Sequence, residues 1–173
     1  ISPGEFIPVF EKNGQIMELD YYMWENTCIL LHKWLEEGRE VYPVSVNVSR
    51  ISLYNPKIVE EIVELTEKYQ VPKHLLNLEI TETAYMSNPD LMKDVTQKFR
   101  SHGFILLMDD FGSGYSSLNT LKDIDLDILK IDMKFLPSGS NNVKSEKILA
   151  SVIRMAGWLG MPVVVEGVET KEQ

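Results

Sequence analysis

The chain lacks several features that would place it in familiar classes. It has a single cysteine, Cys28, among 173 residues, so it can form no internal disulfide. It also lacks a secretory signal and any run of about 18 apolar residues, the length that a membrane-spanning helix needs. These absences predict a soluble protein of a reducing compartment, the cytoplasm, with no direct membrane contact by this segment.

Positive charge is also scarce, and it is dispersed. The chain has 17 Lys and Arg against 26 Asp and Glu, which gives a net charge of −9. Because proteins that bind nucleic-acid polymers present clustered Lys and Arg, we expect no such polymer as a partner. A small phosphate ligand remains compatible with the acidic charge if divalent cations lie between the two.

What is present is a regular alternation of apolar stretches and amphipathic stretches. Strand patterns lie at 42–48, 75–80, 104–108, 128–131 and 162–165. Helical patterns lie at 3–10, 16–37, 56–70, 89–102, 116–121 and 145–159, with a polar loop at 137–144. Because parallel strands need helical crossovers, the alternation predicts an α/β fold built from βα units.

Each expected strand carries a polar side chain at or near its C-terminal end. In chain order these are Asn47, Glu79, Asp109 with Asp110, Lys130 with Asp132, and Glu166. In a (β/α) barrel the C-terminal strand ends converge on one rim, whereas an open doubly wound sheet spreads them along a line. The pattern therefore favours a TIM-like (β/α) barrel, of which this chain carries about five of eight strands.

The residue types at these strand ends indicate a divalent metal. Carboxylate and amide oxygens suit Mg²⁺ or Mn²⁺, whereas zinc calls for His or Cys. Because neighbouring residues of a strand point to opposite sides, Asp109 and Asp110 can share a site only if Asp110 lies past the strand, in the loop with Gly112 and Gly114. The pair could then ligate two cations that activate a water for phosphoryl displacement, with Lys130 steadying that water or a phosphate oxygen.

Other interpretations fit single residues. Asn47 alone is typical of a turn, and Lys130 with Asp132 could be an ordinary ion pair. Gly112, Gly114 and Ser117 resemble a dinucleotide-binding GxGxxG loop. Ser117 breaks that pattern, and two carboxylates before the loop would repel a pyrophosphate that has no metal. The recurrence of polar groups at successive strand ends therefore favours one shared site.

Six segments, in this order and spacing, carry a family resemblance: FIPVFEKNGQI, SVNVS, LEITET, MDDFGSGYSSL, ILKID and VVVEGVET. From near Phe6 to Thr170 the chain resembles the EAL domain, the bacterial phosphodiesterase that hydrolyses cyclic di-GMP to linear pGpG. The resemblance implies a modified TIM barrel with two Mg²⁺ or Mn²⁺ ions. It also implies cyclic di-GMP as the ligand and a role in bacterial second-messenger signalling.

The resemblance also implies roles for individual residues. Asn47 and Glu79 match ligands of one metal, Asp109 the bridging ligand and Asp110 a ligand of the second metal. Glu166 matches the glutamate assigned as general base or activator of water, and Lys130 the lysine that orients the water. Glu82 matches the residue that anchors the loop of Gly112 and Gly114, and Asp132 and Glu169 match supporting positions.

We expect residues 1–173 to form a single EAL-type domain that is truncated at both ends. The Glu-Ala-Leu strand would precede Ile1, and the last strand would follow Gln173. We further expect a homodimer and fusion to sensor or GGDEF-type domains. Two alternatives to catalysis are a non-catalytic cyclic di-GMP receptor and a protein-interaction or dimerisation module that uses the DDFGSGYSS loop.

Overall fold

The computed structural model describes residues 1–112, 125–132 and 143–171. The predicted short helix at 116–121, the glycine at position 114, and the predicted loop up to residue 142 lie outside the described residues.

The described strands form one parallel sheet in the order of the sequence. They are β1 (Val44–Asn47), β2 (Leu76–Thr81), β3 (Leu106–Phe111), β4 (Ile128–Ile131) and β5 (Val163–Val165). Each strand pairs in parallel with the next, in the order β1-β2-β3-β4-β5. A barrel adds its strands successively, whereas a doubly wound sheet reverses its order at a switch point. The arrangement confirms the predicted fold class, an incomplete TIM-like barrel.

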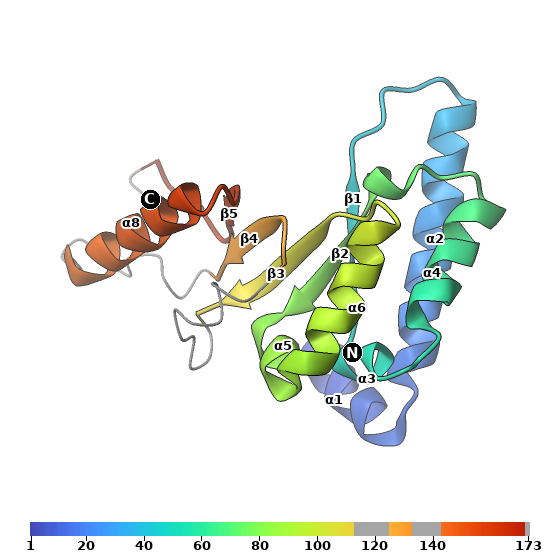
Figure 1. Ribbon diagram of the computed structural model, residues 1–173, viewed down its shortest axis with the longest axis horizontal. Helices are drawn as coiled ribbons and strands as arrows, with labels where there is room; N and C mark the ends of the chain where they lie inside the picture. The colour runs from blue at the N-terminus through green and yellow to red at the C-terminus, as the bar shows by residue number, and fades with distance from the viewer. Residues whose placement is uncertain (113–124, 133–142, 172–173) are drawn as a thin grey trace.

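Helices and one 3-10 turn accompany the described strands (Figure 1). They are α1 (Pro3–Asn13), α2 (Ile16–Glu36), α3 (Arg50–Leu53), α4 (Ile58–Lys68), α5 (Glu82–Ser87), α6 (Pro89–Ser101) and α8 (Val143–Trp158), with a 3-10 turn η1 (Lys73–Leu75) before β2. Figure 1 shows α2, α4 and α6 gathered beside the first three strands and α8 beside β5. None of the described helices is long and apolar enough to cross a bilayer.

Two short helices, α3 and α5, were not predicted. Helix α3 follows β1 after Val48 and Ser49, α5 follows β2 directly, and each begins at a hydroxyl residue that caps it. The Ser49 side chain accepts a hydrogen bond from the Ser52 amide, and the Thr81 side chain accepts one from Ala84. One turn of helix is too short to show an apolar period, so these caps are the only local signal of the two helices.

Alternation along the strands separates an apolar face from a polar one. Leu78 and Ile80 of β2 are fully buried toward the helices, as are Leu106 and Met108 of β3. The residues between them, including Glu79, point to the opposite face because successive side chains of a strand alternate. The carboxylates at the strand ends therefore lie on the inner face of the incomplete barrel.

Strand β3 contains a bulge at the paired aspartates. The prediction ended this strand at Met108, but it continues to Phe111, and this is a correction. Met108 pairs with Leu129 and Phe111 pairs with Ile131, so two residues of β3 face the single position of Lys130 on β4. Asp110 has φ +56°, the left-handed conformation that Asp tolerates better than most residues. The extra residue lets both aspartates remain within the strand.

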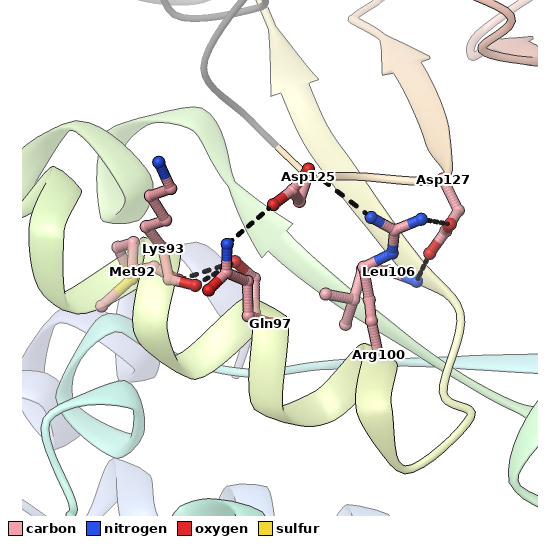
Figure 2. A network of polar contacts seen from close by, with 8 residues as sticks. Met92, Lys93, Gln97, Arg100, Leu106, Asp125 and Asp127 are labelled. Atoms are coloured by element: carbon pink, nitrogen blue, oxygen red, sulfur yellow. Dashed lines mark hydrogen bonds and ion pairs between the residues drawn. The ribbon is translucent and has the colours of Figure 1, made fainter.

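The N-terminal end of β4 is tied to α6 by a set of polar contacts, which we call the Arg100 network (Figure 2). The Arg100 guanidinium lies 3.1 Å from Asp127 and 3.7 Å from Asp125. The Gln97 side chain donates to Asp125 at 3.1 Å, and the Leu106 amide donates to Asp127 at 3.0 Å. These contacts fix the start of β4 against both α6 and β3.

Candidate active site

Lys130 is the centre of a cluster of carboxylates at the C-terminal ends of the strands. Its ammonium lies 2.8 Å from Glu79 Oε2 on β2, 2.9 Å from Asp109 Oδ1 on β3, and 2.8 Å from Glu166 Oε1, directly after β5. We call these four residues the Lys130 cluster. The barrel topology thus brings together side chains from four strand ends that are far apart in the sequence.

The cluster is buried and carries an excess of negative charge. The side chains of Lys130 and Glu79 are each 11% exposed, whereas Glu166 is 43% exposed and lies at the open side. Burial alone would lower the pKa of Lys130, but hydrogen bonds to the three carboxylates outweigh it and raise this pKa above its ordinary value of 10.5. Lys130 is therefore a cation at neutral pH, and one ammonium faces three carboxylates.

Two further predicted site residues lie beside the cluster. Asn47 ends β1 and pairs in register with Glu79 of β2, and its side chain is exposed. Asp110 occupies the bulge, where its amide donates to Asp109 Oδ1 at 3.0 Å. Both residues therefore lie at the same end of the sheet as the three carboxylates.

The predicted supporting residues divide into buried and exposed groups. Glu82, 2% exposed, accepts a hydrogen bond from the Gly112 amide at 2.8 Å, so α5 is bonded to the first residue after β3. Gly112 has φ +90°, a conformation that favours glycine. Asp132 is buried just after β4, whereas Glu169 is exposed on the segment after β5.

The described residues fit a divalent cation in donor type and in charge. Hard oxygen donors are supplied by Asn47, Glu79, Asp109 and Asp110. The carboxylates around the Lys130 ammonium outnumber it, so the site carries net negative charge. Within the described ranges, however, no group of three His, Cys, Asp or Glu is arranged as a metal site. In the Lys130 cluster the carboxylates converge on the ammonium itself, so the lysine takes the place of a cation among them.

Sequence reasoning missed the contacts that hold the end of β1. Trp24 of α2 donates from Nε1 to the Asn47 carbonyl at 2.9 Å, and Asp20 of the same helix binds the turn that follows. Trp24 and Asp20 belong to the buried stripe of an amphipathic helix, where an aromatic residue is expected in any case. The only local signal was an acidic residue within that stripe.

The fold and the strand-end acids define a class, the (β/α) barrels with an acidic site at the C-terminal rim. The chain belongs to the EAL domain family, whose model matches residues 1–173. Among curated relatives it is 34% identical over 99% of its length to the signaling protein YkoW of Bacillus subtilis, and 35% identical over its whole length to the cyclic di-GMP phosphodiesterase NbdA of Pseudomonas aeruginosa.

The chain spans about a fifth of these two relatives, 21% of YkoW and 22% of NbdA. Among solved structures, the PaMucR phosphodiesterase in its c-di-GMP complex superposes with a TM-score of 0.90 at 28% identity. That superposition covers 99% of this chain and 75% of the PaMucR chain. The predicted family is therefore confirmed, and relatives of this chain are named for cyclic di-GMP chemistry.

Proposed function

We propose that this chain is part of an EAL domain that hydrolyses cyclic di-GMP to linear pGpG with the help of divalent cations. The observation that carries the proposal is the Lys130 cluster, in which strands β2, β3 and β4 and the residue after β5 contribute to one buried acidic centre. The names of NbdA and PaMucR support the substrate, because both refer to cyclic di-GMP.

In this proposal Asn47, Glu79, Asp109 and Asp110 hold two Mg²⁺ or Mn²⁺ ions. Such ions, when bound, lower the pKa of a water and offset the charge of a phosphodiester. Glu166, at the exposed side of the cluster, accepts the proton of the attacking water. In this proposal one of the three Lys130 N–H groups, which bond carboxylates in the structure, turns to the water or to a phosphate oxygen and orients it.

Three further acids, of which Glu82 and Asp132 are buried, would keep the parts of the centre in place. Glu82 accepts from the Gly112 amide, and in this proposal it anchors the loop to which Gly112 and Gly114 belong. Asp132 and Glu169 have supporting roles in this proposal. We also propose that residues 1–173 are one domain truncated at both ends, in a cytoplasmic homodimer fused to sensor or GGDEF-type domains.

The experiment is a hydrolysis assay of the full-length protein with cyclic di-GMP and Mg²⁺ or Mn²⁺, in which pGpG is measured by chromatography. We expect pGpG to form with either cation and not with EDTA. Asp109→Asn should abolish the product without unfolding the protein. Binding of cyclic di-GMP without any pGpG would contradict the proposal.

One observation favours a second candidate, a receptor that binds cyclic di-GMP without cleaving it. The ammonium of Lys130 already occupies the centre of the three carboxylates, and no ready metal group is found in the described ranges. A receptor of this kind would bind cyclic di-GMP equally well in EDTA. Equilibrium dialysis with and without cations, beside the hydrolysis assay, separates the two functions.

A further inference from the structure

The C-terminal end of β1 is held from two sides. On one side, Trp24 of α2 is 1% exposed and donates from its indole Nε1 to the Asn47 carbonyl at 2.9 Å. On the other side, the amide of Val48 donates to the Glu79 carbonyl of β2 at 2.9 Å. The peptide bond that joins Asn47 to Val48 is therefore bonded at both its oxygen and its nitrogen, while the Asn47 side chain stays exposed.

The turn after β1 is bonded to the same helix, one turn earlier. The Oδ2 atom of Asp20 accepts from the Ser49 amide at 2.9 Å and from the Ser52 hydroxyl at 2.7 Å. Ser49 in turn accepts from the Ser52 amide and begins α3. Backbone atoms of residues 47–52 thus make four of these hydrogen bonds, and the partner lies in α2 or β2 in three of them. The bond from the Ser52 hydroxyl to Asp20 is a fifth, through a side chain.

These bonds differ from apolar packing between a helix and the sheet. Apolar contacts hold two elements together but do not depend on direction. A hydrogen bond also holds two elements together, and it fixes the distance and the angle between its donor and its acceptor. Burying the Asp20 carboxylate is unfavourable, because loss of hydration raises its pKa, and the bonds from Ser49 and Ser52 only partly lower it again. A leucine would pack there without this cost, so the directional bonds are the distinctive contribution of this residue.

We propose that Trp24 and Asp20 are positioning residues that hold the backbone around Asn47, so that its amide side chain lies beside Glu79 at the rim of the barrel. Asn47 is next to Glu79 in the β1–β2 register, and a shift of about 1 Å in a binding group can cost 10²-fold in rate. This inference rests on the proposed function, in which Asn47 and Glu79 bind the same cation.

The first test is a double-mutant cycle in the full-length protein. Trp24→Phe keeps an aromatic ring and removes the indole N–H, and Ile62→Val is a control in the buried face of α4. We expect Trp24→Phe to lower kcat on the order of 10-fold, and to have less than about a 2-fold effect when Asn47→Ala is already present. Ile62→Val should change kcat by less than about 2-fold in both backgrounds. Equal effects of Trp24→Phe in both backgrounds would overturn the proposal.

Asp20 offers a conservative variant that tests the same idea. Since both donors bind one oxygen of Asp20, Asp20→Asn keeps an acceptor for them, and Asp20→Ala keeps none. We expect Asp20→Asn to restore most of the kcat that Asp20→Ala loses. If Asp20 and Trp24 only stabilised the fold, the loss of kcat in each variant would be proportional to its loss of melting temperature. The control Ile62→Val shows how much kcat changes for a given loss of melting temperature. If Trp24→Phe does not fold, Ser52→Ala, which removes one hydroxyl, takes its place in the cycle.

A second readout does not depend on hydrolysis. The side-chain amide resonance of Asn47, assigned by NMR through its loss in Asn47→Ala, should shift in Trp24→Phe and Asp20→Ala but not in Ile62→Val. An unchanged Asn47 resonance in both variants would overturn the inference, whether or not the protein cleaves cyclic di-GMP. If the resonance shifts but the wild type forms no pGpG, the proposed function fails and the positioning of Asn47 stands.

Discussion

Strand β4 carries an ionic cluster at each end, and the two clusters differ in burial and charge. At its N-terminal end the Arg100 network joins side chains that are 42%, 44% and 23% exposed, for Arg100, Asp125 and Asp127. At its C-terminal end Lys130 and Glu79 are each 11% exposed and Asp109 is 15% exposed, and only Glu166 reaches 43%. One guanidinium faces two carboxylates in the first cluster, and one ammonium faces three in the second.

The difference indicates what each cluster contributes. Exposed ion pairs are screened by water and add little to stability, so the Arg100 network mainly sets the position of β4. A buried excess of carboxylates is unfavourable unless another cation joins it, so the Lys130 cluster has the charge balance expected of a cation-binding site. The same contrast holds in barrels generally, where function lies at the C-terminal rim.

The largest effect should come from removing the central cation. Lys130→Met leaves three carboxylates with no ammonium between them, and we expect the free energy of unfolding to fall by about 3–5 kcal/mol in metal-free buffer. Because the pKa of Lys130 is raised, its stabilising contribution is complete below pH 10.5, declines as the pH rises from there, and is gone once the pH has passed the raised pKa. The loss should therefore be the same from about pH 6 to about pH 9 in urea unfolding.

The next largest effect should be stabilisation by Mg²⁺, which we expect to depend on the Lys130 cluster and not on the Arg100 network. Mg²⁺ at about 100 times its dissociation constant should stabilise the wild type by about 2.7 kcal/mol and raise its melting temperature. Asp109→Ala should lose most of this shift, and the control Asp125→Ala in the Arg100 network should keep it. Equal shifts in Asp109→Ala and the wild type would contradict a metal site at the Lys130 cluster.

The Gly112 amide, directly after β3, is a neutral donor at the same rim, and its bond to Glu82 can be removed by mutation. Glu82→Ala leaves the Gly112 amide without the bond at 2.8 Å, and we expect a loss of about 1–3 kcal/mol in urea unfolding. Hydrolysis of cyclic di-GMP should fall as well, because the aspartates lie shortly before Gly112. Glu82→Gln keeps an acceptor oxygen and should lose less of both, and an activity unchanged in Glu82→Ala would contradict the anchoring role.

Asp20 is a third case beside the two ionic clusters. Its carboxylate is buried, and its hydrogen-bond partners are the neutral donors of Ser49 and Ser52 instead of a cation. Its pKa is raised above 3.8 by burial, against the bonds from Ser49 and Ser52, and the charge of Glu11 adds to the rise. The folded protein therefore holds this proton more tightly than the unfolded chain does. This contribution favours folding at low pH and is lost as the pH rises through the raised pKa.

Urea unfolding of the wild type and Asp20→Asn over a range of pH measures this contribution. The stability of the wild type relative to Asp20→Asn should fall as the pH increases above 3.8. The opposite slope would show that the carboxylate is stabilised in its charged form.

The smallest effect should come from the exposed end of β4. Arg100→Gln removes two partly exposed ion pairs, and we expect the free energy of unfolding to change by about 1 kcal/mol or less. Hydrolysis should be unchanged, because the Leu106 amide still bonds Asp127 and keeps the β3–β4 connection. A large loss of activity in Arg100→Gln would mean that the position of Lys130 depends on the far end of its strand.

Much of the fold could be predicted from the sequence. Period-2 and period-3.6 patterns identified all five described strands and the long helices, because burial of one face leaves a regular apolar repeat. The family and the barrel class are confirmed by the comparisons. The gathering of Glu79, Asp109 and Glu166 also follows from their positions at successive strand ends.

The remaining features depend on contacts between distant segments. No local pattern distinguishes a strand that ends at Met108 from one that bulges and continues to Phe111, since the register is set by pairing with β4. The bonds from Trp24 and Asp20 to the end of β1 join residues at least 23 positions apart. Spacing in the sequence alone also could not decide whether Lys130 pairs with Asp132 or with the three carboxylates of the other strand ends.

The bulge in β3 has a consequence for how such sites diverge among genes. One residue more on β3 than on β4 allows two neighbouring aspartates to face the single position of Lys130. Deletion of one codon here would restore an even ladder and leave one acid at that position. A domain with a paired acidic centre and a domain with a single acid would then differ by one indel, with every other strand-end residue unchanged.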